Sequence, residues 1–123
     1  MDVLLGIALS SHIGFQFDYN EIHPQIRLEN EKYAIGAFYN SEENISLYGA
    51  KRIIINNQTS IELGISSGYN YENYPVIPFA RGVYEQNENI RYFIAPSVEE
   101  IRYNDGTSDL NTGFIIGVEL FLR

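Results

Sequence analysis

The sequence has no cysteine and no tryptophan, and it contains a single methionine. Without cysteine the chain can form neither a disulfide framework nor a thiolate metal site, so its cysteine usage indicates no redox compartment. Basic residues are also scarce, because 8 Lys and Arg stand against 16 Asp and Glu, for a formal net charge of −8. A protein that binds a phosphate backbone needs a basic face, so this balance argues against a nucleic-acid partner.

Long apolar runs are absent as well. No segment approaches the roughly 18–20 apolar residues of a transmembrane helix. The apolar stretch 3–11 resembles a short secretory h-region, but Asp2 replaces the basic flank and an alternating pattern follows directly. We therefore interpret this stretch as part of the fold. If Met1 is native, a cytoplasmic or virion-associated location is expected; if Met1 replaced a removed leader, the chain is exported.

Strand-forming residues are plentiful instead, with 10 tyrosines and many Phe, Val and Ile residues. From Val3 to Phe17 the odd positions are mainly bulky and apolar, and the even positions are small and increasingly polar. Side chains alternate faces along a strand, so this pattern predicts a barrel wall whose small face carries His12. A membrane barrel turns the bulky face to lipid and a soluble barrel turns it to the core, so both orientations stay open.

Eight strand-like segments follow one another, separated by turn signals rich in Asn, Asp and Glu. We place them near residues 3–17, 22–30, 32–40, 45–55, 60–70, 75–86, 89–102 and 112–122. No stretch keeps a 3.6-residue apolar period long enough for a helix. The last segment repeats the pattern of the first, as expected if the two pair. The sequence thus predicts one all-β domain over 1–123, an eight-stranded antiparallel up-and-down β-barrel.

Two arginines argue against the membrane orientation. Arg81 shares its strand face with apolar residues such as Phe79 and Val83, and Arg91 shares its face with Phe93. A charge in the middle of a lipid-facing wall costs about 2–4 kcal/mol. Glutamates at 62 and 119 are expected either to line a polar lumen or to face water.

Candidate catalytic residues lie at the ends of two expected strands. His12 is near the end of the first strand, and Asn40 and Ser41 end the third. These strands run in the same direction, so their ends meet at one rim, where His12 and Ser41 can form a nucleophile–base pair oriented by Asn40. The simpler interpretation of Asn-Ser at a strand end is a hairpin turn.

The second histidine, His23, precedes Pro24 and is expected in a turn. With only two histidines and no supporting carboxylate spacing, we expect no metal site and no cofactor.

The chain resembles the lipid A palmitoyltransferases of the PagP type. Residues 33–41 (Tyr-Ala-Ile-Gly-Ala-Phe-Tyr-Asn-Ser) and 46–49 resemble that family's central segment. Residues 9–15 resemble its first strand with the active-site His, and 18–21 resemble a Tyr-Asn-Glu that follows it. Three further segments, 61–68, 75–79 and 92–96, and the last strand align in the same order. The likeness covers nearly the whole chain.

This resemblance implies an outer-membrane barrel that accepts one acyl chain in an apolar lumen and transfers it from a phospholipid to lipid A. His12 then matches the catalytic His and Ser41 the catalytic Ser, while Asn40 occupies the position of the catalytic Asp. An amide orients an imidazole but does not stabilise imidazolium as a carboxylate does. The substrate-binding positions implied are Tyr39, Ser46, Pro75, Pro78 and Pro96.

The three prolines have two interpretations. Proline has no backbone N–H to donate to a strand ladder, so Pro78 and Pro96 on neighbouring strands can leave a gap in the wall. The resemblance implies that the acyl chain enters through this gap. Alternatively, the prolines start or bend strands.

Beyond a transferase or hydrolase, two other functions stay open: a non-catalytic barrel that binds a lipid or small ligand, and a structural or interaction protein such as a virion component. The expected partner is an acyl chain or lipid, with membrane contact if the chain is exported.

Overall fold

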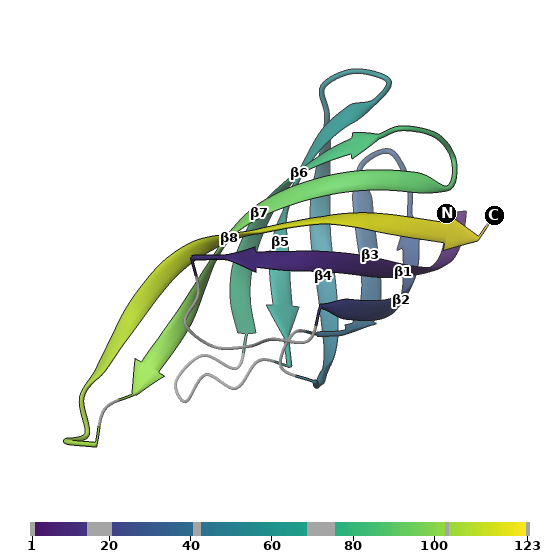
Figure 1. The fold of residues 1–123 in the computed structure, drawn as a ribbon. Helices are drawn as coiled ribbons and strands as arrows, with labels where there is room; N and C mark the ends of the chain where they lie inside the picture. Colours follow the sequence, from purple (N-terminus) through teal and green to yellow (C-terminus); the bar gives the residue numbers. More distant parts are fainter. Residues whose placement is uncertain (1, 15–20, 41–42, 69–75, 103, 123) are drawn as a thin grey trace.

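The computed structural model describes residues 2–14, 21–40, 43–68, 76–102 and 104–122. It contains eight strands: β1 (Asp2–Ile13), β2 (Ile22–Glu29), β3 (Tyr33–Tyr39), β4 (Ile45–Ile54), β5 (Thr59–Ser67), β6 (Val76–Glu85), β7 (Ile90–Arg102) and β8 (Ser108–Leu122). Each strand pairs antiparallel with the next, and β8 pairs with β1, which closes the barrel (Figure 1). The predicted fold class is therefore confirmed. No helix in the described part of the chain is long and apolar enough to span a bilayer.

The two ends of the barrel differ. Both termini and the short turns after β2, β4 and β6 lie at one end, and the opposite ends of the strands lie at the other (Figure 1). Each short turn uses the same device, in which an asparagine Oδ1 accepts hydrogen bonds from the backbone N–H groups two and three residues further on. The asparagines are Asn30, Asn56 and Asn87. These Asx turns explain why Asn marked the strand boundaries in the sequence.

The small, polar face of β1 points into the barrel. Leu4, Ala8 and Ser10 are buried, whereas Val3 and Leu9 are 59% and 41% exposed. The orientation that alternation alone left open is thus settled, with the bulky apolar face outside.

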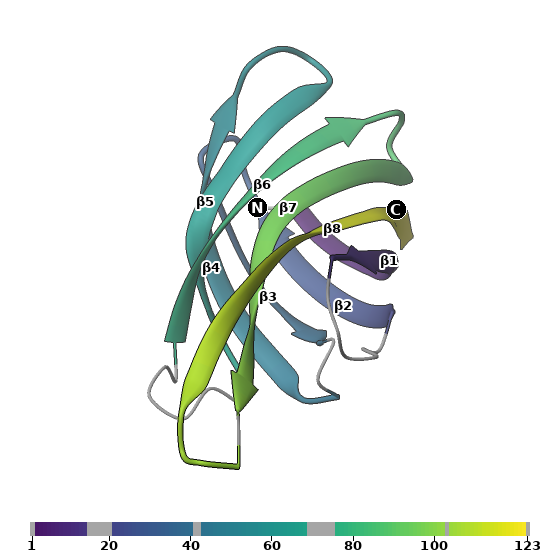
Figure 2. The same cartoon turned by 60° about the vertical axis from the view of Figure 1, so that its left-hand side comes forward.

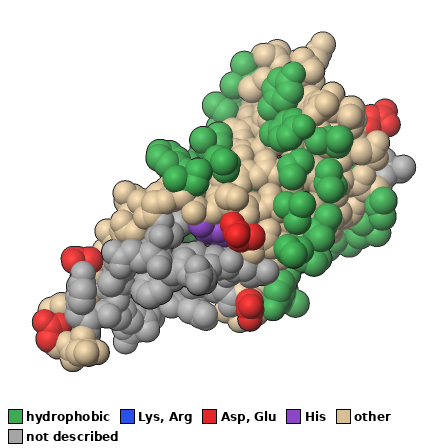
Figure 3. Space-filling model, viewed as in Figure 1, with side chains coloured by type: hydrophobic (Ala, Val, Ile, Leu, Met, Phe, Trp, Pro, Cys, Tyr) green, Lys and Arg blue, Asp and Glu red, His purple; other side chains and the backbone are tan. Residues whose placement is uncertain are grey.

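The same alternation continues around the barrel. Among the largest fully buried side chains are those of Arg27, Arg91 and Glu62, while large apolar side chains on every strand are exposed. Figure 3 shows hydrophobic side chains gathered over the outer wall on the face that it displays. The barrel therefore has an apolar outside and a charged inside.

Three glycines on the inner face make room for aromatic rings. Each stands directly opposite an aromatic residue of the adjacent strand, and an added Cβ would lie 2.6–2.8 Å from the nearest ring atom. The pairs are Gly6 with Phe121, Gly36 with Tyr48, and Gly117 with Phe93. The close approach of a ring therefore requires glycine at these three positions. Pairing a glycine with an aromatic residue on the adjacent strand also helps to keep the two strands in register.

The structure corrects one predicted turn. His23 and Pro24, expected in a turn, lie inside β2, where Pro24 stands opposite Ile7 of β1. The ladder between β2 and β3 begins only at Gln25, so Pro24 lies beyond the pairing with that neighbour. β8 also begins at Ser108 rather than near 112. Residues 15–17, predicted to continue the first strand, lie outside the described residues.

The seam between β6 and β7 is short. Its ladder runs only from the pair Gly82–Ile94 to the pair Glu85–Arg91, whereas β7 and β8 stay paired as far as Arg102. Beyond the seam, β7 and β8 continue as a two-stranded ribbon that projects from the barrel (Figures 1 and 2). Pro78 and Pro96 both lie beyond this four-pair ladder, and each stays paired on its other side, opposite Ile65 and Phe114.

The contact between ring and glycine is testable at Gly117. An alanine Cβ there would lie 2.4 Å from the Leu9 carbonyl oxygen and 2.6 Å from the Phe93 ring. We expect Gly117→Ala to lower the free energy of unfolding by about 1–3 kcal/mol, measured by urea titration of the refolded barrel. Gly49→Ala is the control, because its Cβ would meet only Ile35 at 3.8 Å. Equal stability of the two variants would contradict this account of the packing.

Candidate functional site

A cluster of ion pairs fills the barrel toward the end that carries the termini. Its centre is Glu62 on β5, which is fully buried. Both Nη atoms of Arg27 donate to its carboxylate, and Arg81 Nε donates at 2.8 Å. Arg52 Nε completes the set with an ion pair at 3.4 Å. One carboxylate thus joins arginines from β2, β4 and β6.

A second carboxylate, Glu29 on β2, joins the same network from another side. Arg91 of β7 binds it in a bidentate manner, with N–O distances of 2.6 and 2.8 Å. Arg27 Nε donates to the same carboxylate at 2.8 Å, and Arg52 Nη1 donates at 3.2 Å. Charge-assisted and bidentate hydrogen bonds of this kind are the strong ones, and each arginine is shared between strands.

Glu119 of β8 completes the cluster. It accepts a hydrogen bond from Gln25 Nε2 at 2.7 Å and forms an ion pair with Arg81 Nη1 at 3.1 Å. Two guanidinium groups also lie over inward-facing rings, Arg81 over Phe93 and Arg91 over Phe121, at 5.4 and 5.2 Å from the ring centroids. Every one of these charged groups therefore has a partner inside the barrel.

The ion pairs correct one expectation. The resemblance implied an apolar lumen for an acyl chain, but this level of the described interior holds arginine and glutamate side chains that are 0–14% exposed. The interior therefore has no apolar channel here. Arg81 and Arg91 face inward, so the objection that they placed a charge on a lipid-facing wall does not apply.

An aromatic layer separates the ion pairs from the opposite end. The inward rings form a series of three edge-to-face contacts with centroid distances of 5.7–6.4 Å. The series runs from His23 on β2 through Phe38 on β3 and Tyr48 on β4 to Phe79 on β6. Edge-to-face contacts are a favoured geometry for aromatic rings. Beyond this layer lie small polar side chains.

Asn40 organises the β3–β4 connection. Its Nδ2 donates to Ser46 Oγ at 2.9 Å and to the Gly68 carbonyl at 2.8 Å, and its Oδ1 accepts the Asn44 N–H at 3.0 Å. Asn40 and Ser46 are both fully buried. The amide therefore ties this connection to the end of β5, which is the turn role that the sequence also suggested.

The predicted site residues are distributed as follows. His12 is half-buried on the inner face of β1, at the same end of the barrel as Asn40, as predicted. Ser46 is also inside, whereas Tyr39, Pro78 and Pro96 are exposed. Ser41 and Pro75 lie outside the described residues. Among the described residues no group of three or more His, Cys, Asp or Glu is arranged to hold a metal ion.

One pair that the sequence did not predict stands out. Ser10 Oγ and His23 Nε2 are 2.7 Å apart, and His23 Nδ1 lies 2.9 Å from the Tyr39 carbonyl oxygen. Ser10 and His23 are 7% and 8% exposed. The pairing of β1 with β2 brings them together. Ala8 stands opposite His23, and Ser10 is the next residue on the same face of β1. Extending the second strand's alternation through Pro24 would have placed His23 on the inner face.

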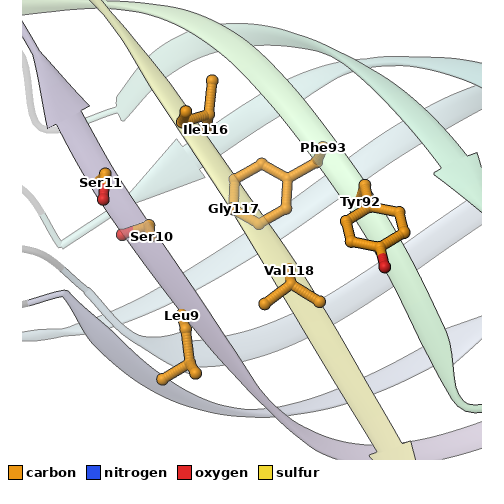
Figure 4. A pocket seen from close by; sticks show the side chains of 8 residues that line it. All are labelled: Leu9, Ser10, Ser11, Tyr92, Phe93, Ile116, Gly117 and Val118. Carbon is orange, nitrogen blue, oxygen red and sulfur yellow. The ribbon is translucent and has the colours of Figure 1, made fainter.

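Ser10 also lines a groove on the wall formed by β1, β8 and β7. The groove has a volume of about 480 Å³ (Figure 4). Its lining residues are Leu9, Ser10, Ser11, Tyr92, Phe93, Ile116, Gly117 and Val118. Gly117 stands directly opposite Ser10, so this part of the wall has no side chain from β8.

No protein-family model matches the chain, and no curated protein matches it.

The ion-pair cluster is testable at its centre. Glu62→Gln keeps the shape of the side chain but leaves buried arginines without a counter-charge. We expect it to lower the free energy of unfolding by about 3–5 kcal/mol, measured by urea titration. Glu88→Gln, in an exposed turn, is the matched control and should change stability little. A loss below about 1 kcal/mol at position 62 would contradict the central role of Glu62.

Proposed function

We propose that this chain is a membrane-embedded β-barrel whose outer wall contacts lipid acyl chains and whose interior is closed by ion pairs. The observation that carries the proposal is an exposed apolar belt to which all eight strands contribute. One large apolar residue from each strand illustrates it: Val3, Ile26, Ile35, Leu47, Leu63, Val76, Ile94 and Leu120. A protein partner covers one side of a molecule, whereas lipid contacts the whole circumference.

The reversed polarity of the wall supports this proposal. Among outward-facing strand positions with described side chains, Lys51 is the one charged residue, and it stands opposite Tyr33 at the start of β3. The inward positions carry the arginines and glutamates instead. A closed sheet with apolar residues outside and polar residues inside satisfies its backbone groups by strand pairing, here except along the edges of β6 and β7 beyond their four-pair ladder.

The two ends of the barrel support the same proposal. Short turns at one end and longer connections at the other are typical of membrane barrels. Three exposed tyrosines, Tyr33, Tyr84 and Tyr92, lie toward the short-turn end, and the last two are direct partners across β6 and β7. Aromatic side chains of this kind favour the boundary between lipid and water.

A pair of matched substitutions tests the proposal. Ile26 lies within the wall on β2, and Ile55 lies in the turn beyond β4; they are 46% and 56% exposed. In a bilayer, Ile26→Arg should destabilise the barrel by about 2–4 kcal/mol and Ile55→Arg by about 0–1 kcal/mol. The measurement is refolding into phosphatidylcholine vesicles, followed by flotation and urea titration. If the barrel does not float with vesicles, or if both variants behave alike, the proposal is wrong.

Acyl-ester chemistry by His12 and Ser41 is a second candidate function. It is favoured by the position of His12 and Asn40 at the same end of the barrel. We expect His12→Ala and Ser41→Ala each to abolish release or transfer of acyl chains from phospholipid vesicles, measured by mass spectrometry of the lipids. Ser108→Ala, at an exposed position, is the control. Full acyl release in both His12→Ala and Ser41→Ala would remove this candidate.

A further inference from the structure

Both lysines of the chain lie at one corner of the barrel, at the end that carries the termini. Lys32 is in the turn after β2, and Lys51 is on the outer face of β4. Strand pairing brings them close together, because Lys51 stands opposite Tyr33 and the Arg52 N–H donates to the Lys32 carbonyl oxygen at 2.7 Å. Both lysines and Tyr33 are exposed. Two positive charges thus flank one exposed tyrosine.

Neither lysine is neutralised by the described part of the chain. The salt bridges there join arginines to glutamates, and neither lysine takes part in one. Glu31, in the same turn as Lys32, is exposed as well and forms no salt bridge with either lysine. The described salt bridges therefore engage arginines inside the barrel, whereas the lysines are available to a ligand outside it.

The opposite end of the barrel carries charge of the other sign. Near that end, the exposed charged residues with described side chains are Glu21, Glu43, Asp105 and Asp109, and all four are acidic. The sequence of the four segments that connect strands there contains no Lys or Arg. The face shown in Figure 3 displays acidic side chains and no Lys or Arg. Positive charge on the described surface is therefore concentrated at the corner of Lys32 and Lys51.

In the proposed bilayer, this corner lies at the boundary between lipid and water. Tyr33 is 54% exposed at the start of β3, and tyrosine favours that boundary. Lys51 points outward beside it, and the long apolar stem of a lysine carries its ammonium group to the headgroups. A charge that faces acyl chains alone is costly, so the position of Lys51 favours an anionic partner at the headgroup level.

We propose that Lys32, Lys51 and Tyr33 bind the phosphate group of an anionic phospholipid; this site rests on the proposed membrane location. The two ammonium groups pair with phosphate oxygens, and the Tyr33 hydroxyl donates a hydrogen bond to the same group. The phosphate of phosphatidylcholine is already neutralised by its own choline, so it gains less from two lysines. Because the opposite end is acidic, the same charges direct the lysine end toward an anionic leaflet.

The test measures lipid binding by the full chain in detergent micelles. Native mass spectrometry gives the dissociation constant of the first bound phosphatidylglycerol and, separately, of the first bound phosphatidylcholine. We expect phosphatidylglycerol to bind at least about tenfold more tightly, and Lys32→Gln and Lys51→Gln each to weaken its binding about fivefold. The double variant should bind the two lipids alike. Equal affinity of the unchanged chain for both lipids, or unchanged affinity in both single variants, overturns the proposal.

A charge-matched variant separates a local site from the effect of net charge. Lys51→Gln/Glu88→Gln has the net charge of the unchanged chain, but its second substitution lies in the turn between β6 and β7. It should bind phosphatidylglycerol as weakly as Lys51→Gln does, and recovery of the affinity overturns the site. All these positions are exposed, so the substitutions should change stability little. Displacement of the lipid by an equal concentration of inorganic phosphate would overturn its assignment to a headgroup.

The outcomes separate this proposal from the membrane location on which it rests. A barrel that floats with phosphatidylcholine vesicles but does not prefer phosphatidylglycerol overturns the lysine site and leaves the membrane location standing. A barrel that does not float overturns the membrane location. If such a barrel still prefers phosphatidylglycerol in micelles and loses that preference in the double variant, the lysine site is supported without it.

Discussion

Neutralisation of charge inside the barrel is the constraint on which the rest of the structure depends. A buried charge is strongly unfavourable unless it is paired and hydrogen-bonded, and Glu62 and Glu29 provide partners for arginines from four strands. Long guanidinium side chains also need room, so small residues such as Ala34 and Ala50 occupy neighbouring inner positions. The apolar side chains therefore lie on the outer wall.

This arrangement divides the interior into two chemical environments. The ion pairs close the barrel toward the termini, and the ring of His23 begins an aromatic layer that separates them from the opposite end. On the far side of that layer, Ser10 and Asn40 are held by partners on other strands. The ion pairs thus fill one half of the interior, and Ser10, His23 and Asn40 lie in the other half.

The sequence predicted the strands and their closure because alternation and turn residues are local signals. It did not predict which strand face is inside, because an alternating pattern is the same whichever face points inward. Arg81 and Phe79 share a face, and in the sequence this charge argued against a lipid-facing wall, but both residues face inward. Contacts such as Arg27 with Glu62 join residues 35 positions apart and depend on strand register. His23 was misassigned because Pro24 suggested a turn; the barrel accommodates it where pairing with β3 has not begun.

The unequal seams of the barrel determine the order in which its wall separates. β5 and β6 are joined by nine residue pairs, but β6 and β7 are joined by four. Local opening follows the lowest free energy, so the backbone amides of β6 before Gly82 that point toward β7 should exchange with solvent deuterium sooner than those that bond to β5. During folding, the same seam is expected to close last, after the β7–β8 hairpin has formed from residues close in sequence. The barrel is closed in the folded state, but during folding and local opening it is expected to behave as a sheet whose two edges are β6 and β7.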